Sequence, residues 1–207
     1  MKKNLYSGKF IVFEGLDGSG QSTQSKLLAE FLKKKKYKVL LTKEPTPNSE
    51  AGKKIRKILD KKLKANPAAF QKLYAKDRKE HLEREIVPAL KKGKAVVSDR
   101  YFFSSFAYGR ASGLSLNWLI KINNKFLMPD LTFILEVGPE ICLERIKKRG
   151  DKRTLFEEKE KLEKVWQTYK VLSKRFRNVI MINGEKSIKG VFKNIKKNLK
   201  ILKIYGD

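Results

Sequence analysis

The fold is decided by residues 9–23, which read Lys9-Phe10-Ile11-Val12-Phe13-Glu14-Gly15-Leu16-Asp17-Gly18-Ser19-Gly20-Gln21-Ser22-Thr23. The first six form a β-rich apolar run that predicts a strand and stops at Gly15. Apolar residues then recur at helical spacing from Leu27 to Leu32, which predicts a helix. The glycines in between permit a tight loop whose backbone N–H groups converge on phosphate oxygens at the positive end of the helix dipole. A glycine-rich turn without a ligand is the alternative.

The spacing of this loop matches G-x-x-x-x-G-K-[ST], except that Gln21 holds the lysine position. We expect Gly15 to Thr23 to bind the phosphates of a nucleotide, and the Ser22 hydroxyl to bind a Mg²⁺ ion between its β- and γ-phosphates. Glutamine keeps an N–H donor but loses the charge of lysine. Three explanations stay open: an engineered inactivating change, a non-catalytic relative, or a charge supplied from elsewhere, for which the candidates are Arg149, Lys152 and Arg153.

Four further apolar runs predict strands, at 39–42, 95–98, 130–137 and 179–182. Helical patterns fill the gaps, around 51–63, 67–92, 101–110, 115–127, 139–149, 156–176 and 187–203. Near-continuous apolar strands separated by helices are typical of a parallel sheet covered on both faces. We therefore predict one α/β domain over residues 1–207, with a five-stranded parallel sheet, helices on both faces and a short lid at about 149–156. Pro88 is expected to disturb the last turns of the 67–92 helix.

The charge balance is strongly one-sided, with 49 Lys and Arg against 22 Asp and Glu and a formal net charge of +27. Such an excess points to polyanionic partners: nucleic acid, an anionic membrane surface or phosphorylated small molecules. Lysine enrichment that reflects genome composition alone accounts for it equally well. The lysine-rich segments, such as residues 33–36, have no aromatic rings interleaved with them, so we expect no specific nucleic-acid partner.

The counts of cysteine and histidine and the lengths of the apolar runs exclude several classes of protein. One cysteine, Cys142, excludes an intramolecular disulfide framework, and one histidine, His81, excludes a multi-histidine metal centre. No apolar run approaches the roughly 18 residues of a membrane span, and no secretion signal is present, so we predict a cytoplasmic protein with no membrane partner. We interpret His81 as a polar helix residue and Cys142 as a small core side chain.

Beyond the loop, several motifs occur in an order and spacing that resemble thymidylate kinases. They are Lys43-Glu44-Pro45-Thr46, Leu73-Tyr74-Ala75-Lys76-Asp77-Arg78, Asp99-Arg100-Tyr101-Phe102-Phe103-Ser104-Ser105-Phe106-Ala107-Tyr108, Met128-Pro129-Asp130-Leu131-Thr132, and the arginine-bearing segment 149–153. Many nucleotide kinases share the loop, whereas the runs 73–78 and 99–108 are much more specific. The resemblance covers nearly the whole chain and implies the P-loop NTPase fold.

Two of these motifs make chemical sense as an acceptor site. Tyr74 and Arg78 are four residues apart and so lie on one face of a helix, where a ring can stack on a base and a guanidinium can donate to a base carbonyl. Arg100 follows the third strand and therefore lies at the carboxyl edge of the sheet, where ligands of open α/β sheets bind. The resemblance implies that Tyr74 and Arg78 contact thymine, and that Arg100 grips the acceptor phosphate.

Further roles follow from the resemblance alone. It implies that Ser105 hydrogen-bonds the base, that Tyr108 packs on the sugar, and that Asp17 lies near the phosphate and sugar of the acceptor. It also implies substrate-binding positions at Glu44 and Pro45, a position near Mg²⁺ for Asp99, and catalytic arginines in the lid at Arg149 and Arg153.

Three positions depart from the resemblance. Lys43 stands where arginine is usual, Gly109 replaces a common glutamine, and Glu136 replaces a common aspartate. Lys43 keeps the charge but loses the bidentate geometry of arginine. The missing side chain at Gly109 removes one possible contact to the base.

The implied reaction is transfer of the γ-phosphoryl group of Mg-ATP to the 5′-phosphate of dTMP, which gives dTDP and ADP. Because the acceptor is already anionic, no histidine base is needed. The resemblance also implies a homodimer. Two alternatives stay open: a kinase for another nucleotide or a deoxynucleoside, and a nucleotide-binding relative impaired by Gln21.

Overall fold

The computed structural model describes residues 1–148, 150 and 155–199. Its five strands pair in parallel in one sheet with the order β2-β3-β1-β4-β5. They are β1 (Lys9–Gly15), β2 (Val39–Lys43), β3 (Ala95–Asp99), β4 (Leu131–Glu136) and β5 (Val179–Asn183). Because β1 is the central strand, the loop that follows it opens at the middle of the carboxyl edge of the sheet.

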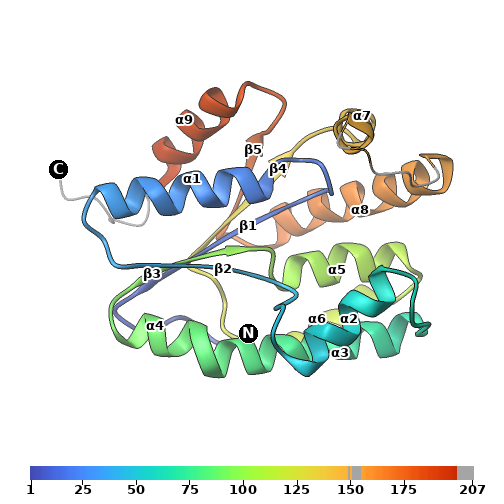
Figure 1. The fold of residues 1–207 in the computed structure, drawn as a ribbon, viewed down its shortest axis with the longest axis horizontal. Coiled ribbons are helices and arrows are strands. Elements are labelled where there is room, and N and C mark those ends of the chain that lie inside the picture. The colour runs from blue at the N-terminus through green and yellow to red at the C-terminus, as the bar shows by residue number, and fades with distance from the viewer. Residues whose placement is uncertain (149, 151–154, 200–207) are drawn as a thin grey trace.

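Helices cover both faces of this sheet (Figure 1). One face carries α1 (Gln21–Lys34) and α9 (Ile188–Leu199). The other carries α3 (Pro67–His81), the π-helical segment η1 (Leu82–Ile86), α4 (Val87–Lys91), α5 (Phe102–Ala111), α6 (Leu116–Asn123) and α8 (Leu155–Arg175). The short helices α2 (Glu50–Leu59) and α7 (Pro139–Lys148) pack on α3 and α8 respectively.

The hydrophobic core lies in two layers, one on each face. Phe10 and Val12 of β1 pack into the layer under α3 to α8, whereas Ile11 and Phe13 pack into the layer under α1 and α9. This alternation is the two-residue period of a strand that is buried on both sides. It explains why β1 is a continuous apolar run, and the predicted α/β class with a five-stranded parallel sheet is confirmed.

The helices differ from the sequence prediction at several points, and the helix expected at 115–127 ends at Asn123. The expected helix 67–92 changes to a π-helical segment at residues 82–86, where the N–H of Val87 donates to the carbonyl of Leu82, so the disturbance expected near Pro88 is confirmed. The helix expected to reach residue 63 ends at Leu59. Of the predicted lid, Arg149 and residues 151–154 lie outside the described residues, and residues 155 and 156 already belong to α8. None of the described helices is long and apolar enough to cross a membrane.

Candidate active site

The loop between β1 and α1 has the backbone geometry of a phosphate cradle. Gly18 (φ 87°) and Gly20 (φ 97°) both adopt left-handed conformations that glycine tolerates best. At Gly18 a Cβ atom would also meet the carbonyl oxygen of Cys142 at 2.6 Å. Gly20 stands at the N-cap of α1 and no side chain caps the helix there. The first N–H groups of α1 are therefore available to anionic oxygens at the positive end of the helix dipole.

A hydroxyl and a carboxylate meet beside this cradle. The Ser22 hydroxyl in the first turn of α1 donates to Oδ2 of Asp99, at the end of β3, over 2.5 Å. The second carboxylate oxygen, Oδ1, is buried and has no hydrogen-bond partner in the described part of the chain. No cluster of three or more His, Cys, Asp or Glu side chains suited to a metal occurs among the described residues. This oxygen donor set fits Mg²⁺, which takes one or two protein ligands and otherwise water and substrate phosphate.

Gln21 is turned into the loop. Its side chain is 6% exposed. We assign the amide orientation that satisfies both of its polar atoms: the oxygen accepts from Nη2 of Arg100 at 2.6 Å, and the nitrogen donates to Oγ of Ser19 at 2.7 Å and to the carbonyl of Leu16 at 3.2 Å. The residue at the lysine position thus joins the loop to an arginine.

Arg100 is held in place by its backbone and by three neighbouring groups. Its φ of 73° is left-handed, a strained conformation that non-glycine residues keep mainly where the surroundings enforce it. Its guanidinium donates to the carbonyl of Gly15 at 3.1 Å and to Oγ of Ser104 at 2.8 Å, and it pairs with Asp17 at 2.7 Å. The guanidinium also lies 5.5 Å from the ring centre of Tyr108, whose hydroxyl accepts from the N–H of Asp17.

Behind Arg100 lies a buried carboxylate that no motif indicates. Glu14 of β1 is fully buried and accepts from the backbone N–H of Tyr101 (2.9 Å), the hydroxyl of Ser104, and the hydroxyl of Tyr169 on α8 (3.3 Å). Ser104 therefore contacts both Glu14 and Arg100. The available signal was an acidic residue inside an otherwise apolar strand.

Burial raises the pKa of Glu14 to about 7, although the hydrogen bond from Ser104 and the charge of Arg100 act in the opposite direction. The ordinary value is 4.5, so the folded protein binds this proton more tightly than the unfolded chain between those two values. Stability from this group is therefore complete below pH 4.5 and is lost as the pH rises through 7.

Glu14→Gln removes this titration. Between pH 4.5 and 7.5, the free energy of unfolding of the wild type is expected to fall by about 3 kcal/mol relative to that of the variant. Urea unfolding of both proteins at several pH values measures the difference, because all other groups titrate in both. Parallel stability curves for the two proteins would contradict the expectation.

Next to these groups, α3 carries a buried ionic network. The Arg78 side chain on α3 is 1% exposed and pairs with Glu44 at 2.7 Å. It also donates to Oδ1 of Asn123 at 2.5 Å and to Oγ of Ser105 at 3.1 Å. The guanidinium is thus paired and oriented by three different elements, as a buried charge requires.

His81 is a polar residue of a helix, as interpreted from the sequence, and the structure adds that it is buried. It lies on α3 and is 2% exposed. Its Nε2 lies 2.7 Å from Oγ1 of Thr42, and its Nδ1 lies 3.3 Å from Oε1 of Glu44. A polar residue can be buried here because both ring nitrogens have partners. Cys142 is buried in the core as expected.

Asp77 fixes the segment that follows β2. It belongs to the run 73–78 quoted above, but the sequence did not indicate its role. Asp77 is fully buried on α3 and accepts from the N–H (2.9 Å) and the hydroxyl (2.5 Å) of Thr46 and from the hydroxyl of Ser49. Ser49 in turn caps α2 through the N–H of Gly52. These bonds hold the chain just after Pro45 against α3.

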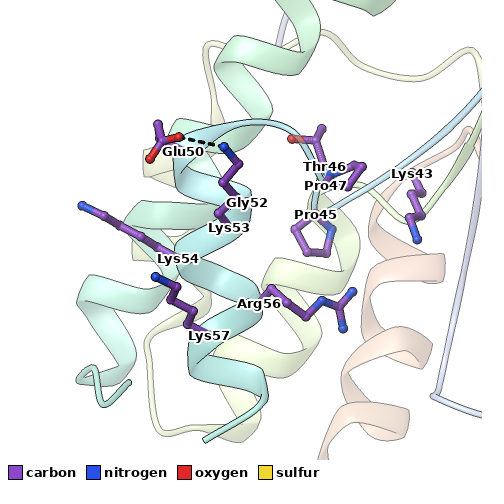
Figure 2. A pocket seen from close by; sticks show the side chains of 10 residues that line it. All are labelled: Lys43, Pro45, Thr46, Pro47, Glu50, Gly52, Lys53, Lys54, Arg56 and Lys57. Carbon is purple, nitrogen blue, oxygen red and sulfur yellow. Dashed lines mark hydrogen bonds and ion pairs between the residues drawn. The ribbon is translucent and has the colours of Figure 1, made fainter. Parts of the chain in front are cut away.

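A basic cavity of about 400 Å³ opens between this segment and α2 (Figure 2). Arg56 points toward the side of Lys43 and Pro45, whereas Lys54 extends away on the opposite side of the helix. Burial raises the pKa of the Tyr74 hydroxyl to about 12, and the charges of Arg100, Asp17, Arg78 and Arg56 also act on it. The Tyr74 ring packs against the ring of Phe70 on the same helix, with the ring centres 5.0 Å apart. Arg56, which no motif indicates, is a further cation at this site.

The structure brings together most of the predicted site residues. At the carboxyl edge of the sheet gather residues 15–23, Glu44, Pro45, Arg78, Asp99, Arg100, Ser105 and Tyr108, and Tyr74 lies one turn before Arg78 on α3. Arg149, Lys152 and Arg153 lie outside the described residues. A different cation reaches the loop from α7: Arg145 donates to the carbonyl of Ser19 at 3.4 Å and to that of Gly184 at 3.3 Å.

The central strand, the glycine cradle that opens α1 and the cations around it define a P-loop protein of the phosphoryl-transfer class. Residues 13–195 match the family model described as thymidylate kinase. The chain belongs to the thymidylate kinase family. The family and P-loop fold predicted from the motifs are therefore confirmed, as is the class of enzyme, a nucleoside monophosphate kinase.

Curated relatives agree with this assignment. A protein named probable thymidylate kinase from Pyrococcus horikoshii is 45% identical over 193 residues, which covers 91% of this chain and 94% of the relative. Thymidylate kinase from Caldicellulosiruptor saccharolyticus is 41% identical over 196 residues, covering 92% and 95%. Probable thymidylate kinase from Methanocaldococcus jannaschii is 41% identical over 191 residues, with the same coverage.

Proposed function

We propose that the chain transfers the γ-phosphoryl group of ATP to dTMP, which gives dTDP and ADP. Its membership of the thymidylate kinase family supports dTMP as the acceptor. It favours neither of the two alternatives, which are a kinase for another acceptor and an impaired nucleotide-binding protein. The observation that carries the chemistry is the position of Arg100, whose guanidinium joins the loop carbonyl of Gly15 to Asp17 beside the Ser22–Asp99 pair.

The donor phosphates fit the loop from Gly15 to Thr23, where the uncapped N–H groups of α1 face them. Ser22 and the unpartnered Oδ1 of Asp99 would hold Mg²⁺. When bound, this ion neutralises charge on the β- and γ-phosphates and orients them.

The reaction needs no proton abstraction. An oxygen of the dTMP 5′-phosphate forms a bond to the γ-phosphorus of ATP, and the bond from that phosphorus to the β–γ bridging oxygen breaks, so that ADP leaves with the electron pair. Arg100 donates to the acceptor phosphate and stabilises the charge that spreads over the transferred group. Asp17 orients Arg100 and lies beside the acceptor. Arg56 adds a second cation on the acceptor side.

The acceptor nucleoside lies between α3 and α5. Tyr74 stacks on the base, Arg78 and Ser105 hydrogen-bond it, and Tyr108 packs on the sugar. Glu44 pairs with the buried charge of Arg78, and Pro45 lines the cavity next to the phosphate. The fixed donors of Arg78 support this assignment because a pre-oriented guanidinium loses little freedom on binding.

Charge at the loop comes from arginines in place of the P-loop lysine. Arg100 contacts Gln21 directly, and Arg145 reaches the backbone of the loop from α7. Arg149 and Arg153 are proposed to add to them from the lid when it closes over ATP, and closure excludes water from the reaction. We also propose that the enzyme works in the cytoplasm as a homodimer, which analytical ultracentrifugation can test for the oligomeric state.

A coupled assay of ADP release tests the function. With Mg-ATP and dTMP, dUMP, dCMP, dGMP or AMP as acceptor, we expect the highest kcat/KM for dTMP. Gln21→Lys should raise the rate by less than about tenfold, because the arginines already supply charge at the loop. A folded wild-type protein without dTMP turnover would refute the proposal. A rate that appears only with the lysine would identify the chain as an impaired relative.

A further inference from the structure

One polar group between α3 and α5 has no partner among the residues that the structure describes. Gln71 of α3 is 5% exposed, and its side-chain oxygen Oε1 is buried without a hydrogen bond. An unpaired acceptor in such a place costs free energy, so buried acceptors are almost always satisfied by a partner, a water molecule or a ligand.

Gln71 lies on the helix face that carries the acceptor residues. It precedes Tyr74 by three residues and Arg78 by seven, so all three lie on one side of α3. The facing helix α5 shows the same alignment, because Ser105 and Gly109 are four residues apart. Arg78 donates to Ser105 at 3.1 Å. Gln71 of α3 faces Gly109 of α5 in the same way, farther along the interface between the two helices.

The absence of a side chain at Gly109 makes room for the amide. A Cβ atom at this position would lie 3.3 Å from Cδ of Gln71 and 2.7 Å from Cδ2 of Leu119. The amide of Gln71 therefore occupies space that another residue at position 109 would fill. Tyr74 follows Gln71 by three residues on the same side of α3, so the unpartnered oxygen belongs to a residue of that helix face.

We propose that Gln71 determines specificity for the acceptor base, its Oε1 accepting a hydrogen bond from the N3–H of a thymine or uracil ring. The proposal rests on the proposed function and deepens it. The imide N3–H is the one ring donor of these bases, whereas N3 of cytosine carries no hydrogen and would face the amide oxygen as a second acceptor. Arg78 and Ser105 hydrogen-bond one edge of the base, and Gln71 accepts a hydrogen bond from the adjacent edge.

The test compares Gln71→Met, which keeps the volume but removes the acceptor, with wild type. The expected result is a ten- to hundredfold fall in kcat/KM for dTMP and dUMP, a clearly smaller change for dCMP, and an unchanged KM for ATP. The ratio of kcat/KM for dTMP to that for dCMP is decisive, because loss of packing alone lowers both values. Gln71→Leu serves as the second variant should the methionine protein fail to fold.

The chain offers a matched control in Gln24→Met. Gln24 of α1 is also buried, at 3% exposed, and its Oε1 also has no partner, but its amide nitrogen donates to the carbonyl of Ile188. Its replacement should leave the dTMP to dCMP ratio unchanged. A ratio preserved within about twofold in the Gln71 variants would overturn the inference alone. Wild-type protein that is folded but does not phosphorylate dTMP would overturn the proposed function, and this inference with it.

Discussion

Arg100→Met is expected to reduce kcat/KM for dTMP by about three orders of magnitude. The substitution removes a guanidinium that joins Gly15, Asp17 and Ser104 at the point where the acceptor phosphate is proposed to bind. Arg100→Lys keeps the charge but loses the planar geometry of the guanidinium, so its activity should lie between that of the wild type and that of Arg100→Met. Steady-state kinetics with dTMP and ATP varied separately measures both effects.

Arg110→Met is the matched control for this prediction. Arg110 lies on the same helix α5, but its side chain is exposed to solvent. Its replacement should leave both kinetic constants near the wild-type values. If Arg100→Met retained more than about a tenth of the wild-type kcat/KM while Arg110→Met was silent, Arg100 would not stabilise the transferred charge.

Glu44→Gln is expected to lower the free energy of unfolding by about 3–5 kcal/mol. Glu44 is 5% exposed and is the carboxylate that pairs with the buried guanidinium of Arg78. Without its charge, Arg78 stays buried among Asn123, Ser105 and aromatic rings with no anion to compensate it. Urea unfolding followed by circular dichroism measures the loss.

Glu50→Gln is the corresponding control, because Glu50 pairs with Lys53 on the surface of α2 and both side chains are largely exposed. Screening by water makes such a pair weak, so its unfolding midpoint should hardly move. Equal midpoints for Glu44→Gln and Glu50→Gln would mean that the buried pair adds no net stability. The double variant Glu44→Gln/Arg78→Met, which removes both charges, should recover part of the loss.

Groups that are close in the sequence were predictable, and groups that meet through the fold were not. The loop at 15–23 is one contiguous pattern, and Arg100 follows a strand directly, so the carboxyl edge could be placed before the structure. Glu14 and Tyr169 are 155 residues apart and touch only because α8 packs on α5 beside β1. Gln71 is inconspicuous in the sequence, since its significance depends on the missing side chain of Gly109 on another helix.

The same contrast applies to charge: the net charge can be counted in the sequence, but the charged side chains that meet at the site cannot be identified by counting. Net charge +27 suggested a polyanionic partner, yet among the described residues Arg78 and Arg100 are the cations that specific carboxylates hold at the site. Arginines fill these positions because a planar guanidinium bonds several acceptors at once. Many lysines, such as the run at 33–36, are exposed at the ends of helices. A count of charges therefore says little about which of them face the substrate.

The π-helical segment at residues 82–86 interrupts one long helix. It rotates the side chains of the part after it, α4, about the helix axis relative to those of the part before it, α3. In an α-helix each residue turns the chain by about 100°, so the wider turn here acts as a single inserted residue. Before it, Gln71, Tyr74 and Arg78 lie on the side of α3 that is proposed to bind the acceptor, and after it Ala89 and Leu90 are buried in the core. Deleting one residue between 82 and 86 would restore a regular helix and rotate one set of side chains against the other. Such a deletion would therefore change either the face of α3 that is proposed to bind the base or the packing of the core, so both depend on the length of this segment.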